Sequence, residues 1–100
     1  MPLFLVDERP GGAWLPGVDT REQPLWNEHA AFIDELFERG LIVLGGPLAD
    51  GAGAAVLVFD AESEAAIREL LAADPWAAHD ILHVERICEW RIFLDARTRP

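Results

Sequence analysis

The sequence of 100 residues contains no lysine, a single cysteine and no long apolar run. Without lysine, no side-chain amine can form a Schiff base with a carbonyl substrate, so that route of covalent catalysis is excluded. Cys88 has no second cysteine with which to form an internal disulfide bond or a cysteine-rich metal site. No stretch approaches the roughly 18 apolar residues that cross a bilayer, and we therefore expect no membrane segment.

Basic residues are also scarce, because 18 acidic residues face 8 basic ones, which are all arginine. The resulting charge of −10 opposes attraction to nucleic acid phosphates or to anionic lipid, so neither is an expected partner. The start of the chain, Met1 to Val6, has no basic lead and no small-residue cleavage site typical of a secretion signal. We expect a cytoplasmic protein.

The length and the apolar content of 51% predict one domain over residues 1–100. Apolar runs and turn residues along the chain give the order strand, helix, strand, strand, helix, strand. This order predicts a ferredoxin-like α+β fold, with an antiparallel sheet and both helices on one face. The expected strands cover residues 3–6, 41–44, 54–59 and 82–94; the first helix begins between residues 20 and 24 and stops at 40, and the second runs from a cap at 63 to a stop at 75.

The expected strands are apolar on both faces, as in Leu41 to Leu44 and Ala55 to Phe59. A sheet with one wet face would alternate apolar and polar residues. Two helices cover only one face, so we expect a second copy of the chain to pack its sheet against the other, as in a dimeric α/β barrel. The alternative is a monomer with an exposed apolar sheet.

Two polar residues, His29 and Asp74, fall on the apolar stripes of the two expected helices. His29 shares its row with Trp26, Ile33, Leu36 and Phe37, and Asp74 continues the row of Ile67, Leu70 and Leu71. Burying a polar side chain without a partner costs roughly 1–3 kcal/mol. The simplest interpretation is that the two side chains face each other.

The predicted topology gathers several segments at one end of the sheet, where a ligand pocket is expected. They are the loop from residue 9 to 22, the start of the first helix, the link from residue 45 to 53, and the end of the second helix. Trp14 and Leu15 on the long first loop are natural covers for an apolar ligand. The residues predicted to contact a ligand are Trp14, Trp26, Gly46, Pro47 and Trp76. Alternative roles are a turn for Gly46 and Pro47, and core or interface positions for the tryptophans, Trp90 included.

A histidine–aspartate pair in such a pocket favours acid–base chemistry. The carboxylate fixes the imidazole tautomer and stabilises the imidazolium, so that the other ring nitrogen exchanges a proton near neutral pH. As the last residue of a helix, Asp74 would face the negative end of the helix dipole, which a nearby imidazole offsets. Ser63 is better explained as a helix cap and Cys88 as a strand residue, so covalent catalysis is disfavoured. Alternatively, His29 is a core histidine bonded to a carbonyl and Asp74 is a helix stop.

Several short motifs occur together and in order: Pro10 to Gly17 (PGGAWLPG), Gln23 to His29 (QPLWNEH), Gly45 to Leu48 (GGPL) and Ala73 to Trp76 (ADPW). With them the chain resembles the YCII-related family over almost its whole length. The resemblance implies a dimeric α/β barrel and an enzyme whose signature histidine and aspartate are His29 and Asp74. One branch of the family resembles dehydrochlorinases of chlorinated hydroxyhydroquinones, and the wider superfamily includes muconolactone isomerases and small monooxygenases.

A second histidine pair, His79 and His83, has the four-residue spacing that binds zinc on a helix. His83, however, falls where the last strand begins, so we expect no metal site and no cofactor. The sequence thus predicts an enzyme that eliminates from or isomerises a cyclic or phenolic metabolite, with His29 and Asp74 as the catalytic pair. The alternatives are a noncatalytic ligand-binding or regulatory dimer and a cofactor-free oxygenase.

Overall fold

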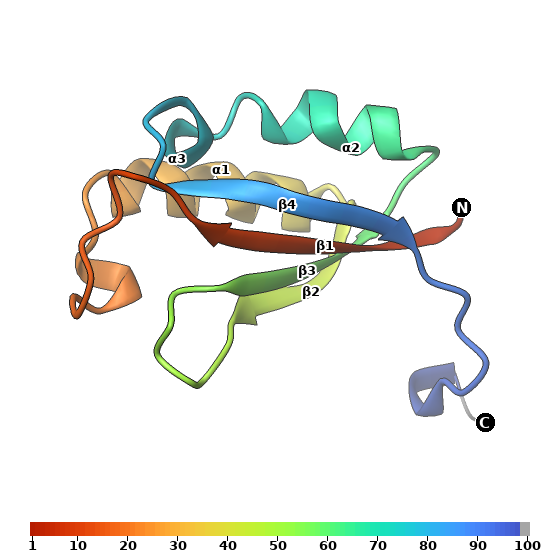
Figure 1. Ribbon diagram of the computed structural model, residues 1–100. Helices are drawn as coiled ribbons and strands as arrows, with labels where there is room; N and C mark the ends of the chain where they lie inside the picture. Colours follow the sequence, from red (N-terminus) through yellow and green to blue (C-terminus); the bar gives the residue numbers. More distant parts are fainter. Residues whose placement is uncertain (99–100) are drawn as a thin grey trace.

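The computed structural model describes residues 1–98, so the last two residues of the predicted domain lie outside it. Four antiparallel strands form one sheet in the order β2-β3-β1-β4 (Figure 1). The strands are β1 (Leu3–Pro10), β2 (Ile42–Pro47), β3 (Ala55–Asp60) and β4 (Leu82–Glu89). This arrangement confirms the predicted ferredoxin-like α+β fold.

The helices α1 (Trp26–Glu38), α2 (Glu64–Leu71) and α3 (Pro75–Ala78) all lie on one face of the sheet (Figure 1). Short 3-10 turns lie at Thr20–Glu22 and Ala96–Thr98. Ser63 caps α2 as predicted, since its hydroxyl accepts the Ala66 N–H at 3.1 Å. Gly40, with a φ of +78°, follows the end of α1 in the left-handed conformation that glycine allows.

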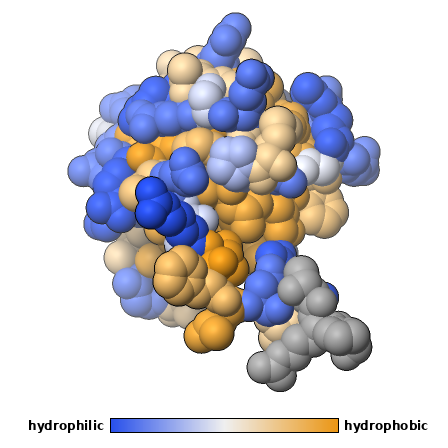
Figure 2. All heavy atoms as spheres, turned by 90° about the vertical axis from the view of Figure 1, so that its right-hand side faces the viewer, coloured by the Kyte–Doolittle hydropathy of each residue, from blue (hydrophilic) through white to orange (hydrophobic). Residues whose placement is uncertain are grey.

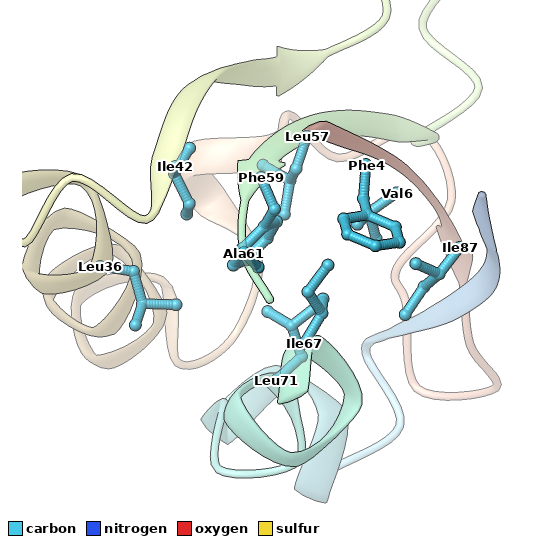
Figure 3. Packing of buried hydrophobic residues seen from close by; sticks show 10 residues of the cluster. All are labelled: Phe4, Val6, Leu36, Ile42, Leu57, Phe59, Ala61, Ile67, Leu71 and Ile87. Atoms are coloured by element: carbon cyan, nitrogen blue, oxygen red, sulfur yellow. The ribbon is translucent and has the colours of Figure 1, made fainter. Parts of the chain in front are cut away.

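The main core lies between the sheet and the helices α1 and α2. Alternate residues of β1 point toward the helices, and Val6 lies opposite Leu57 on β3 and Ile87 on β4. Figure 3 shows these strand side chains meeting Ile67 and Leu71 of α2. The buried residues of this cluster are Phe4, Val6, Leu36, Ile42, Leu57, Phe59, Ala61, Ile67, Leu71 and Ile87.

Several sequence-based predictions of the elements were wrong. Helix α1 begins at Trp26, because the residues before it form the 3-10 turn and a Leu25 in the left-handed conformation. Strand β4 ends at Glu89 instead of Leu94. The Trp90 N–H still bonds to the Leu3 carbonyl at 2.8 Å, but β1 begins at Leu3 and therefore has no residues with which the chain after Trp90 could pair. A third helix, α3, follows Pro75, whereas the sequence predicted two helices.

One residue assigned to the apolar stripe of α1 does not lie on it. Phe37 is 58% exposed, whereas Phe32 and Ile33 pack against the core. Two ion pairs with i,i+4 spacing lie along the helices, Glu35 with Arg39 at 4.0 Å and Glu64 with Arg68 at 2.9 Å.

On the face of the sheet turned away from the helices, the part formed by the predicted apolar runs is apolar, whereas Asp7 lies opposite Arg86 farther along β1. Leu5 lies opposite Val58 and Cys88 there, and Leu44 pairs with Val58. The segment after β4 borders this face, where Trp90 and Ile92 line a hollow together with Leu44 and Val58. Viewed from the end where β4 leaves the sheet, apolar surface extends through the middle and lower part of the molecule (Figure 2).

Candidate functional site

The imidazole of His29 and the carboxylate of Asp74 lie side by side inside the protein. His29 is in the first turn of α1, and its Nδ1 is 2.9 Å from both carboxylate oxygens of Asp74. Both residues are buried, with exposed fractions of 8% and 2%. The two polar residues on the predicted apolar faces therefore satisfy each other. Their catalytic role stays a prediction.

Asp74 occupies a different position in the backbone from the one expected. It was predicted as the last residue of a helix, but α2 ends at Leu71 and Asp74 is the N-cap of α3. The reason is Pro75, which favours an extended conformation in the residue before it and is well suited to the first position of a helix. The Asp74 carboxylate accepts a hydrogen bond from the Trp76 N–H at 2.9 Å. Asp74 therefore lies at the start of a helix, where a carboxylate is favourable, and not at the end of one as predicted.

Aromatic rings fix the plane of the His29 imidazole. Trp76 stacks on it, with ring centroids 3.8 Å apart and an interplanar angle of 6°. Trp76 itself is held by a hydrogen bond from its Nε1–H to the Pro24 carbonyl at 2.7 Å. Trp26 lies 5.7 Å from both rings, and Trp14 meets Trp76 edge-on at 5.9 Å. The imidazole is thus held in one orientation from two directions.

The pairing of Nδ1 with a carboxylate assigns the tautomer of neutral His29. A carboxylate oxygen only accepts hydrogen bonds, so Nδ1 carries the proton and donates it. The opposite nitrogen, Nε2, then keeps its lone pair. Within residues 1–98, no other group forms a hydrogen bond with Nε2. This nitrogen is therefore free to act on a ligand.

A cavity of about 120 Å³ lies beside His29, between the sheet and the helices α1 and α3. An engineered cavity of about 150 Å³ binds benzene, so this volume suits a ligand of one small ring. All five predicted ligand residues line it, whereas Leu15 is exposed and Asp74 lies behind His29. The lining residues are Glu8, Trp14, Thr20, Trp26, His29, Ile33, Gly46, Pro47, Gly53, Ala55, Leu57, Trp76 and Leu82.

Gly53 allows the β2–β3 loop to approach this cavity closely. Its φ is +90°, and a Cβ there would lie 2.8 Å from Pro10 Cγ and 2.9 Å from Trp14 Cζ2. A side chain at this position would displace the Trp14 ring from the cavity wall.

A larger hollow of about 550 Å³ lies between α1 and α2. Its charged side chains are those of Glu35, Arg39 and Glu69, and the pair of Glu35 and Arg39 is exposed to solvent. Neither His29 nor Asp74 lines this hollow. We therefore assign the candidate site to the smaller cavity, which holds the buried titratable groups.

Glu8 is a buried carboxyl group of the cavity that the sequence analysis missed. It is only 5% exposed, and burial, followed by the negative charge of Asp74, raises its pKa from 4.5 to about 7. The first strand was predicted to end at Val6, which left Glu8 outside it. The signal was present in the alternation, because Phe4, Val6 and Glu8 occupy every second position and face the same side.

The loop that carries Trp14 is anchored by another buried residue that the sequence analysis missed. Gln23 is 3% exposed; its Oε1 accepts the Leu15 N–H at 2.8 Å, and its Nε2 donates to the carbonyls of Leu15 and Val18 at 2.8 and 2.9 Å. Asp80 holds the start of the same loop by accepting the Gly12 N–H at 2.8 Å. The wall of the cavity is thus fixed by side-chain hydrogen bonds.

Replacing Gln23 by alanine is expected to loosen this loop. The loss of three buried hydrogen bonds leaves loop groups without partners and lowers the free energy of unfolding by about 1–3 kcal/mol. Chymotrypsin cleavage after Trp14, followed by mass spectrometry, measures the loosening. The neighbouring exposed replacement Arg21→Ala is the control, and equal cleavage rates in the two variants would contradict the anchoring role.

The second histidine pair does not form a helical metal site. His79 follows α3, with Nδ1 3.0 Å from the Pro75 carbonyl, whereas His83 lies in β4, 3.3 Å from Glu85. In the described part of the chain, no three His, Cys, Asp or Glu side chains are grouped so that they could hold a metal ion. No helix among residues 1–98 is long and apolar enough to span a membrane. The cytoplasmic location stays a prediction.

Comparison with known proteins agrees with this description. No curated protein matches the sequence. Among solved structures, the chain is similar to 5-chloro-2-hydroxyhydroquinone dehydrochlorinase from Burkholderia phenoliruptrix AC1100 in complex with 2,5-dihydroxybenzoquinone, with 22% identity and a TM-score of 0.61 over 89% of this chain and 93% of that chain. This likeness shows a shared fold. The model of the YCII-related domain matches residues 3–91, and the chain therefore belongs to the YCII-related domain family.

Proposed function

We propose that the protein is an enzyme in which His29, oriented by Asp74, transfers a proton to or from a small cyclic or phenolic metabolite. The reaction class is elimination or isomerisation. The observation that carries the proposal is the bond between Nδ1 of His29 and both oxygens of Asp74, at 2.9 Å, in the wall of a buried cavity.

The chemistry follows from the two ends of the imidazole. Asp74 holds the proton on Nδ1, so Nε2 accepts a proton from the ligand, and the carboxylate stabilises the imidazolium that forms. Trp76 and Trp26 prevent the ring from rotating away. The same pair then works in reverse, because the imidazolium returns the proton to the product or to water.

The ligand class is supported by the cavity and by the structural neighbour. Three tryptophans and His29 form part of a mainly apolar wall, and the cavity volume of about 120 Å³ suits one small ring. The neighbour with the same fold is a dehydrochlorinase bound to a dihydroxybenzoquinone. Covalent catalysis is disfavoured because Ser63 caps α2 and Cys88 lies on the sheet away from the cavity.

Replacement of His29 by alanine is the test. A panel of chlorinated hydroquinones, hydroxyquinones and lactones is screened for chloride release or a change in ultraviolet absorbance. For a substrate that is turned over, His29→Ala is expected to reduce kcat/KM by about 10²–10⁴-fold. The exposed His79→Ala is the matched control. Ligand-induced thermal stabilisation without turnover of any compound would contradict catalysis and favour a noncatalytic ligand-binding dimer.

We also propose that two copies pack through the sheet faces that the helices leave uncovered. Support comes from the apolar pairs on that face, including Leu5 with Val58, and from the exposure of Leu44, Trp90 and Phe93, at 51%, 49% and 92%. Exposed apolar residues gathered on one face are typical of an interaction surface, and a second copy packed there would cover them.

Size-exclusion chromatography with light scattering tests the dimer. A mass near twice 11.1 kDa is expected, and Leu44→Glu is expected to shift the protein toward the monomer because it buries a charge in the interface. The control is Phe37→Glu, which places the same charge on an equally exposed apolar residue of the helical side. A monomer of 11.1 kDa for the unaltered chain would contradict the dimer.

A further inference from the structure

Glu8 is a buried carboxyl group that the proposed reaction has not yet used. It extends from β1 on the helix-facing side of the sheet, where it forms part of the cavity wall, whereas His29 and Trp76 enter the cavity from the helices. Its carboxyl group forms no hydrogen bond with any other group of residues 1–98. The residue is only 5% exposed and it lines the cavity, so a ligand in the cavity could supply the hydrogen-bond partner that this carboxyl group lacks.

The charges around Glu8 are few. Its direct neighbours in the sheet are Ala55 on β3 and Val84 on β4, which are uncharged. The titratable groups that face the cavity from the helical layer are His29 and, behind it, Asp74. Burial and the charge of Asp74 both raise the pKa of Glu8, to about 7. Hydrogen bonds favour the charged form of a carboxylate, and Asp74 has His29 and the Trp76 N–H as partners, whereas Glu8 has none.

We propose that Glu8 is the second proton-transfer group of the cavity, a carboxylic acid that donates its proton to a carbonyl oxygen of the ligand while His29 takes a proton from the adjacent carbon. The inference rests on the proposed function of His29. It narrows the proposed substrate class to a compact cyclic compound whose ketone or lactone carbonyl is directed at the sheet and has a saturated C–H carbon next to it.

The proton and electron balance of the step is complete. His29 Nε2 removes the proton from the carbon next to the carbonyl, the C–H electron pair forms a C=C bond, and the carbonyl π pair moves to oxygen, which takes the proton of Glu8. The product is a neutral enol between an imidazolium and a carboxylate. In an isomerisation the imidazolium protonates a different carbon and Glu8 recovers the hydroxyl proton. In an elimination the leaving group departs with its electron pair, Glu8 again recovers the hydroxyl proton, and the imidazolium gives its proton to water.

The same arrangement predicts which ligands are rejected. No arginine lines the cavity and the chain has no lysine, whereas two carboxyl groups lie at or behind its wall. A ligand with a carboxylate would meet Glu8 and Asp74 without a compensating cation beyond His29. A neutral carbonyl oxygen instead supplies the acceptor that protonated Glu8 lacks.

A carboxyl-carbon NMR titration tests the state of Glu8 independently of any activity. Glu8→Gln identifies the resonance, whose midpoint is expected near 7 and is expected to fall in Asp74→Asn, where a negative charge is removed. If Asp74→Asn does not fold, the titration midpoint of Glu8 in the unaltered protein is sufficient to test the inference. A midpoint in the ordinary glutamate range would overturn the inference, whatever the role of His29.

Hydrogen–deuterium exchange at the ring carbons of cyclohexane-1,4-dione tests the step itself. Proton NMR in D₂O follows the exchange, and both His29→Ala and Glu8→Gln are expected to slow the protein-catalysed rate at least about tenfold. Glu85→Gln, which alters an exposed glutamate of β4 outside the cavity, is the control and keeps the full rate.

The outcomes separate the two proposals. Loss of exchange in His29→Ala with an unchanged rate in Glu8→Gln would overturn the role of Glu8 and leave that of His29. Loss in both variants, with Glu85→Gln at the full rate, supports the pair. An unaltered protein no faster than buffer, while Glu8 titrates near 7, would count against both roles in proton transfer.

Discussion

Replacing Asp74 by alanine is expected to lower the free energy of unfolding by about 3 kcal/mol, because it removes the charged acceptor of a buried hydrogen-bonded pair. The carboxylate has three close contacts, two to Nδ1 of His29 and one to the Trp76 N–H, all at 2.9 Å. Alanine supplies none of them, and the helix cap alone accounts for about 1 kcal/mol. For a domain of this length, the midpoint of thermal unfolding falls by roughly 10–20 °C.

The matched variant is Asp74→Asn, which keeps an oxygen for the cap and removes the charge. Its loss is expected to be about half that of alanine, because Oδ1 accepts either the Trp76 N–H or the imidazole N–H at no large steric cost. Urea unfolding followed by tryptophan fluorescence measures both variants. Asp34→Ala, at an exposed position of α1, is the control. A loss below about 1 kcal/mol for Asp74→Ala would show that the pair contributes little to the fold.

The fold was predictable from sequence because it follows from the spacing of apolar residues. Leu41 to Leu44 and Ala55 to Phe59 are uninterrupted apolar runs, and Gly40 and Ser63 mark helix ends by backbone conformation and side-chain capping. The end of β4 was not predictable in this way. Apolar residues continue to Leu94, and the strand stops at Glu89 only because its partner β1 begins at Leu3.

The candidate site was predictable where a polar residue interrupts an apolar pattern. His29 and Asp74 both do so, and the pair follows from the cost of burying either alone. Gln23 gave no such signal, because it lies in a stretch predicted as loop, and Glu8 continues the alternation of Phe4 and Val6 but lies beyond the apolar run. Their burial depends on tertiary contacts, namely the helical layer over β1 and the folding of the long loop back onto Gln23.

The second large effect is a dependence of stability on pH that comes from Glu8. Its pKa is about 7 in the folded protein and near 4.5 in the unfolded chain, so between these values the folded state binds more protons. The free energy of unfolding therefore falls as pH rises through this window. The difference of about 2.5 pKa units corresponds to a loss of roughly 3 kcal/mol, present in full above pH 7.

Glu8→Gln isolates this contribution, since glutamine does not titrate. Urea unfolding at intervals from pH 4 to 8.5 is expected to show the unaltered protein losing stability relative to Glu8→Gln as pH rises, with the difference levelling off above pH 7. Glu85→Gln, an exposed carboxyl on β4, is expected to follow the unaltered protein. Parallel curves for the unaltered protein and Glu8→Gln would mean that Glu8 ionises as easily when folded as when unfolded. Water would then reach the cavity wall freely, and the dry environment that makes a proton on Glu8 available to a ligand would be absent.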